Sequence, residues 1–122
     1  SKEQLDALKP DFEQMSLLSR ELGVVGVHAF AVSEEMGTDA VCRNFAPLYG
    51  IDEESATGTA NCALACYLYE HLEKKTEYVF EQGQGMGQPS LIVVKLNCGD
   101  NGIESVYVGG RGYLVDEMEL DI

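Results

Sequence analysis

Residues 50–72 read GIDEESATGTANCALACYLYEHL, and the polar and apolar positions change character abruptly within this stretch. From Ala60 to Tyr69 the only clearly polar residue is Asn61, whereas a surface helix shows a polar face at every turn. The pattern predicts a helix that is covered on most sides. It begins in the small residues 57–60, where a ligand could approach the free backbone N–H groups of a helix N-terminus.

Most of the other apolar positions form short alternating or β-branched runs, which predict strands. Residues 2–22 differ, because their apolar positions have helical spacing interrupted by Pro10 and predict one turn followed by a short helix from about Asp11. The predicted strands are Gly23–Val32, Val41–Phe45, Glu77–Gln82, Leu91–Leu96, Glu104–Val108 and Tyr113–Leu120. The simplest architecture is α+β, with a mainly antiparallel β-sheet rolled around one central buried α-helix.

Composition limits the classes of function. The 122 residues suit one domain, and a net charge of −13 with only 8 scattered basic residues disfavours nucleic acid as a partner. The longest apolar run is too short to cross a membrane, and residues 1–14 lack the apolar core of a signal peptide. We therefore expect a cytoplasmic protein with neither a nucleic-acid nor a membrane partner.

The sequence offers little support for a metal or a cofactor. His28 and His71 each lack a second ligand at a suitable spacing, and no pair of cysteines has C-x-x-C spacing. We interpret the cysteines as free structural thiols, with metal ligation and redox pairing as the alternatives. The four are Cys42, Cys62, Cys66 and Cys98.

Polar residues just ahead of the long helix are candidates for chemistry. Glu53 or Glu54 could act as a general base or acid, or could simply complement the helix dipole. Thr57 and Thr59 could contact a ligand or serve as helix caps. The residues alone leave both alternatives open.

Two further features have plainer interpretations. The glycines of Gly83-x-Gly85-x-Gly87 precede a proline and a strand, whereas a dinucleotide fingerprint follows a strand and opens a helix. Arg43 and Arg111 are the cations nearest these loops, and we expect pairing with Glu53 or Glu54 within the protein more than with a substrate carboxylate.

Three strings taken together are similar to the C-terminal half of the PhzF-like isomerases of phenazine biosynthesis. They are RNFAPLYGIDEESATGTA (Arg43–Ala60), QGQGMGQPS (Gln82–Ser90) and VGGRG (Val108–Gly112), and the resemblance covers about residues 23–120. It implies a fold similar to that of diaminopimelate epimerase, with two lobes, each a β-sheet wrapped around a central helix. It also implies an active site between the lobes and cofactor-independent proton transfer on a small carboxylate-bearing metabolite.

The resemblance also assigns roles to residues. It implies Glu54 and Thr59 as catalytic residues, in places where the family often has Asp and Ser, and Gln88 stands where the family commonly has Arg. The substrate-binding residues that it implies are Glu53, Ser55, Thr57, Gly58, Ala60, Gly83 and Met86.

The same resemblance predicts the division of the chain. Residues 1–22 would be a linker or short helix, and residues 23–122 the C-terminal lobe. The principal acid/base Glu of the family belongs to the N-terminal lobe, which we expect to be absent from this chain. We therefore expect no turnover by this chain alone, with the missing lobe or a second copy in a homodimer as partner. The alternative is a ligand-binding or self-associating module without catalysis.

Overall fold

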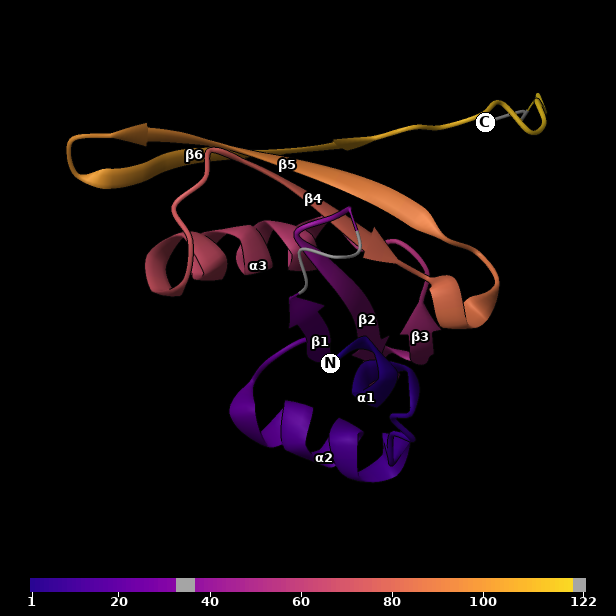
Figure 1. The fold of residues 1–122 in the computed structure, drawn as a ribbon. Coiled ribbons are helices and arrows are strands. Elements are labelled where there is room, and N and C mark those ends of the chain that lie inside the picture. The colour runs from indigo at the N-terminus through magenta and orange to yellow at the C-terminus, as the bar shows by residue number, and fades with distance from the viewer. Residues whose placement is uncertain (33–36, 120–122) are drawn as a thin grey trace.

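A computed structural model describes residues 1–32 and 37–119 (Figure 1). The helices and 3-10 turns are α1 (Lys2–Asp6), α2 (Phe12–Leu22), η2 (Pro47–Tyr49), α3 (Gly58–His71) and η3 (Gln84–Met86). The strands are β1 (Val27–Val32), β2 (Ala40–Ala46), β3 (Ile51–Glu54), β4 (Glu77–Gln82), β5 (Ser90–Gly99) and β6 (Gly102–Gly110).

The strands form one mixed sheet in the order β1-β2-β4-β5-β6, and β3 pairs with β2 beside this path. Only β2 and β4 run parallel; the other pairs between the described strands are antiparallel. Parallel neighbours need a crossover connection, because the chain has to return to the end of the sheet at which the first strand began. Helix α3 lies in the connection between β2 and β4 and makes this return. The predicted α+β class is confirmed, as is a mainly antiparallel sheet.

Helix α3 packs against one face of the sheet. Its buried residues are Asn61, Leu64, Ala65 and Leu68, and the apolar ones join a core that includes Tyr78 and Phe80 of β4. Figure 1 shows the helix beneath β4, β5 and β6. Its outer face is open, however, since Ala63 is exposed and Tyr67 is 51% exposed. Coverage of the helix on most sides is therefore not confirmed.

The N-terminal helices lie on the other side of β1 and β2 (Figure 1). Leu5 of α1 is buried against Ala31 and Val41. Helix α2 begins after Asp11, whose side chain accepts a hydrogen bond from the Gln14 N–H at 3.0 Å. The prediction of a turn followed by a helix from about Asp11 is confirmed.

The structure differs from the predicted secondary structure in two segments, residues 51–54 and residues 113–119. The sequence predicts no strand over residues 51–54, but they pair with β2 as strand β3. The predicted last strand is wrong over residues 113–119, which have no regular secondary structure, and Leu120 lies outside the described residues. A strand needs a hydrogen-bonding neighbour, and this segment runs away from the sheet (Figure 1) with Tyr113 and Val115 85% and 92% exposed. No helix in the described part of the chain is long and apolar enough to cross a membrane.

Candidate functional site

Three segments that are distant in the sequence meet at the N-terminus of α3. Gly83 lies so close to Ser55 that a Cβ atom on this glycine would be 2.7 Å from the Ser55 carbonyl oxygen. A Cβ atom on Gly58 would be 3.4 Å from a methyl group of Val108 in β6. The three strings in the sequence therefore form one region, although each belongs to a different part of the sheet.

Glu54 is the carboxylate at this junction. It ends β3 and is half-buried, and its Oε2 accepts a hydrogen bond from the Thr57 hydroxyl. Within the described residues, its second carboxylate oxygen has no hydrogen-bond partner. A carboxylate held at one oxygen and open at the other can accept a proton from a ligand.

The first turn of α3 begins beside this carboxylate. Thr57 is the N-cap residue, but its side chain makes no capping bond and donates to Glu54 instead. Gly58, Thr59 and Ala60 follow, and helix geometry leaves the N–H groups of a first turn without intrahelical partners. Thr59 is exposed. The turn can therefore offer several N–H groups to an anion while Glu54 stands next to them.

Gln82, which sequence reasoning did not select, connects these residues. Its side chain is fully buried. Its Nε2 donates to the Glu54 carbonyl oxygen at 2.7 Å and to Thr57 Oγ1 at 3.0 Å. Its Oε1 accepts from the Thr57 N–H at 3.2 Å and from Asn61 Nδ2 at 2.8 Å. A sequence signal existed, because the alternation of EYVFEQ places Gln82 on the same face as Tyr78 and Phe80.

A second set of buried polar side chains extends from this amide into the core. Asn61 also donates to the Thr57 carbonyl oxygen at 2.9 Å. His28 Nδ1 lies 3.0 Å from Asn44 Oδ1. Burial lowers the pKa of His28, and the side chains of Asn44 and Asn61 oppose this shift only in part. His28 Nε2 and Asn61 Oδ1 make no hydrogen bond of normal geometry within the described residues.

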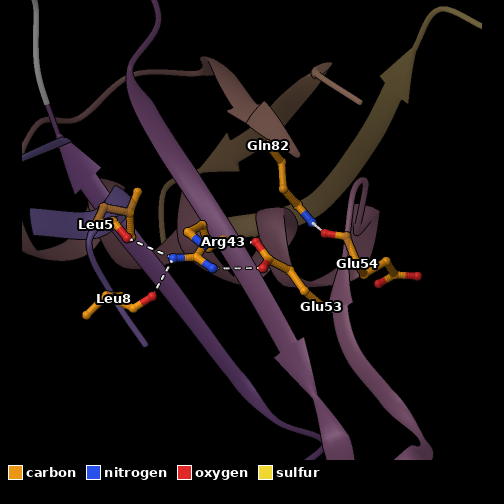
Figure 2. Close-up of polar contacts among 6 residues, drawn as sticks. All are labelled: Leu5, Leu8, Arg43, Glu53, Glu54 and Gln82. Carbon is orange, nitrogen blue, oxygen red and sulfur yellow. Dashed lines mark hydrogen bonds and ion pairs between the residues drawn. The ribbon is translucent and has the colours of Figure 1, made fainter. Parts of the chain in front are cut away.

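Glu53 points to the other face of β3 (Figure 2). Its carboxylate accepts two hydrogen bonds from Arg43, at 2.9 Å from Nε and 2.8 Å from Nη2. Arg43 also donates to the carbonyl oxygens of Leu5 and Leu8 at 3.1 and 3.0 Å. These hydrogen bonds to Glu53 raise the pKa of Arg43. The expected pairing of Arg43 with Glu53 is confirmed. The side chains of Glu53 and Glu54 point in different directions, so the two carboxylates do not share one site (Figure 2).

The remaining predicted residue, Met86, lies in the turn η3 and is 40% exposed. It stays a prediction. A separate hollow of about 1000 Å³ lies over β4, β5 and β6, lined by Val79, Leu91, Val93 and Tyr107 among others, without Glu54. Since its lining is mainly apolar and offers no acid–base pair, we place the candidate site at Glu54.

The structure gives no metal-binding group of three or more His, Cys, Asp or Glu side chains within the described residues. All four cysteines are free thiols, and Cys42 is buried. Burial raises the pKa of Cys42 to about 12, so this thiol stays protonated and unreactive at neutral pH.

The fold and the site define a class of protein: an α+β lobe that presents a carboxylate next to the open N-terminus of its long helix. Comparison with known proteins then gives the family. Residues 1–118 match the family described as phenazine biosynthesis-like protein (PhzC-PhzF). The chain belongs to this family, as its sequence motifs predicted.

Individual relatives agree with this assignment. The chain is 37% identical over 112 residues to an uncharacterized isomerase of Deinococcus radiodurans, covering 87% of the chain and 35% of that protein. It is 32% identical over 110 residues to a trans-2,3-dihydro-3-hydroxyanthranilate isomerase of Pseudomonas fluorescens, covering 88% and 37%.

Solved structures share the fold. A PhzF-family phenazine biosynthesis protein of Bacillus anthracis matches with a TM-score of 0.67 at 19% identity, over 85% of this chain and 41% of that one. A putative PhzC/PhzF protein of Clostridium difficile matches with a TM-score of 0.63 at 24% identity, over 93% and 41%. The chain therefore spans roughly two fifths of the proteins that it resembles.

Proposed function

We propose that this chain is the C-terminal lobe of a two-lobed isomerase that moves a proton on a small carboxylate-bearing metabolite without a cofactor. The observation that carries the proposal is the position of Glu54, held by Thr57 at one oxygen, beside the first turn of α3. The relatives named as isomerases support the same class of reaction. The second acid–base group would come from the other lobe.

Each part of the site has a role in this proposal. The N–H groups at Gly58 and Thr59 hold the substrate carboxylate and stabilise negative charge that develops next to it. Glu54 then accepts or relays a proton through its free oxygen. Thr59 lies on the exposed side of the first turn, where its hydroxyl can hydrogen-bond the same carboxylate. Ser55, Thr57, Ala60, Gly83 and Met86 shape the wall around the ligand, and Glu53 supports the strand through Arg43.

The substitution Glu54→Gln tests the role of the carboxylate. In the two-lobed protein, with trans-2,3-dihydro-3-hydroxyanthranilate as the probe, we expect kcat to fall about 10²- to 10⁴-fold. The amide keeps the size of the side chain and can still accept from Thr57, so the fold should be unchanged. Unchanged turnover would remove Glu54 from the mechanism.

A matched control is available on the same strand. Asp52 is an exposed carboxylate of β3, two residues before Glu54. Asp52→Asn removes one negative charge from the same strand and should leave kcat within about twofold, because Asp52 is exposed. A fall in both variants would mean that net charge, and not Glu54, controls the rate.

A second candidate function, association without catalysis, is favoured by exposed apolar side chains. The largest exposures are on the segment after β6, where Leu114 and Val115 are 82% and 92% exposed. The partner would be the missing lobe or a second copy of the chain. Sedimentation equilibrium of the 122-residue chain over a range of concentrations separates a monomer from a homodimer.

A further inference from the structure

We propose that Gln82 is a positioning residue that directs the Thr57 hydroxyl onto the Glu54 carboxylate. The proposal rests on the proposed function only in that Glu54 is taken to handle the proton. Three observations carry it: the complete burial of Gln82, the pattern of its four hydrogen bonds, and the hydrogen bond that the Thr57 hydroxyl donates to Glu54.

The orientation of the Gln82 amide is fixed by its neighbours. Its Nε2 faces two acceptors, the Glu54 carbonyl oxygen and Thr57 Oγ1. Its Oε1 faces two donors, the Thr57 N–H and Asn61 Nδ2. Rotating the amide by half a turn would set donor against donor and acceptor against acceptor. Because the side chain is fully buried, water cannot replace the bonds that such a rotation would lose.

This orientation decides what the Thr57 hydroxyl can do. A hydroxyl has one hydrogen to donate and two lone pairs that accept. Gln82 Nε2 donates to Thr57 Oγ1, so the hydroxyl cannot donate back to Gln82 and its hydrogen goes to Glu54. Without Gln82, the hydroxyl could rotate to cap the first turn of α3, as N-cap threonines commonly do. Glu54 would then lose its anchor.

The backbone bonds have a second effect. Gln82 joins the last residue of β3 to the first residue of the helix, since it bonds the Glu54 carbonyl oxygen and the Thr57 N–H. Figure 2 shows the Gln82 side chain reaching the Glu54 backbone while the Glu54 carboxylate points away from it. Gln82 thus sets the relative position of the carboxylate and the helix N-terminus without touching a ligand.

The first test is spectroscopic and uses the 122-residue chain. We expect Gln82→Met to shift the side-chain carboxyl 13C resonance of Glu54 in the same direction as Thr57→Val does. Both substitutions remove the same hydrogen bond, so the double variant should show little more than either single one. The control is Tyr78→Phe on the same strand, which removes a buried hydroxyl that donates to the Glu73 carbonyl oxygen at 2.6 Å and lies away from the turn. It should leave the Glu54 resonance in place.

Gln82→Met keeps the size of the side chain but removes its four hydrogen bonds, so this variant could unfold. If Gln82→Met gives no folded spectrum, Gln82→Glu replaces it. An ionised carboxylate at this position can only accept, so it would draw the Thr57 hydroxyl away from Glu54 and give the same shift. Because burial raises the pKa of a carboxyl, the comparison is made at a pH where the 13C resonance of the new carboxyl shows that it is ionised. A Glu54 resonance that stays at its original position in the folded Gln82 variant, while Thr57→Val moves it, overturns the proposal.

The second test measures kinetics in the two-lobed protein with trans-2,3-dihydro-3-hydroxyanthranilate. We expect Gln82→Met to lower kcat about 10- to 100-fold with KM little changed, whereas Tyr78→Phe leaves both unchanged. Normal kcat in Gln82→Met, with a shifted Glu54 resonance, would refute the positioning role. If the unsubstituted protein does not turn over this probe, the proposed function fails for this substrate, and the spectroscopic test still decides for or against Gln82.

Discussion

The two neighbouring glutamates of β3 have opposite surroundings. Glu53 is held through both carboxylate oxygens by Arg43, and the exposed fractions of the two side chains are only 17% and 15%. Glu54 is held through one oxygen by a hydroxyl, and its other oxygen has no partner among the described residues. A fully paired carboxylate holds structure together, whereas a partly paired one beside open N–H groups can act on a ligand. Because the two side chains point in different directions from β3, the structural role of Glu53 and the proposed role of Glu54 are kept apart (Figure 2).

The largest expected effect comes from breaking the Glu53 side. Arg43→Met should lower the free energy of unfolding by about 3 kcal/mol, because it leaves the Glu53 carboxylate without its partner in a largely buried place. It also frees the carbonyl oxygens of Leu5 and Leu8 that Arg43 holds. Urea unfolding of the 122-residue chain measures the loss.

A matched substitution separates charge from geometry. Arg43→Lys keeps the positive charge but cannot make two parallel bonds to one carboxylate, so we expect about half the loss. Equal stability of Arg43→Met and the unsubstituted chain would show that the ion pair contributes nothing measurable. Glu53 would then have no structural role to set against the role proposed for Glu54.

The fold was largely predictable because its signals are local. The apolar stretch after Asn61 predicts a helix, although not its open outer face, and the alternation in 77–82 predicts a strand. Strand β3 was not predictable, since its residues IDEE have neither β-branched alternation nor apolar character beyond Ile51. They become a strand because β2 offers them hydrogen-bonding partners. That cause is tertiary and leaves no pattern in the sequence.

The site was predictable in part for a related reason. Motif strings pointed to residues 53–60 and to Gly83, and the structure brings these segments together at the start of α3. They could not separate Glu53 from Glu54, because their different roles depend on which face of β3 meets Arg43. Gln82 was missed since a glutamine at the end of a strand is usually a surface residue, although the alternation of residues 77–82 places it on the buried face of β4.

A smaller effect is expected from the Glu54 side, at the glycine that lets the 82–90 loop approach. Gly83 has a positive φ of 85°, and an added Cβ would lie 2.3 Å from the Gln88 carbonyl oxygen and 2.7 Å from that of Ser55. Gly83→Ala should therefore cost about 2 kcal/mol of stability. Gly85, in the same loop, has nothing within 4 Å of an added Cβ.

Gly85→Ala is thus the control, and we expect its stability to change by less than about 0.5 kcal/mol. Thermal unfolding of both variants measures the difference. A Gly83→Ala chain as stable as the Gly85→Ala chain would show that the loop does not press against Ser55, and the proposed wall around Glu54 would need a different boundary.

The smallest expected effect is a pH dependence of stability that comes from His28, in the buried polar set behind Glu54. Burial lowers the pKa of His28 below its ordinary value of 6.5, so the folded state favours the neutral ring. The stability that this ring contributes is present above about pH 6.5 and is lost as the pH falls through the lower folded pKa, with a slope of at most about 1.4 kcal/mol per pH unit. Arg43 stays charged throughout this range, so its pairing contributes no such change.

Urea unfolding at several pH values between about 7.5 and 5 tests this dependence. The unsubstituted chain should lose stability more steeply than His28→Gln, which cannot take up a proton. His71 and the carboxylates are common to both chains and cancel in the difference. Parallel pH profiles would mean that His28 takes up protons equally in the folded and unfolded chains, so that burial does not lower its pKa, and that acid does not distinguish the two sides of β3.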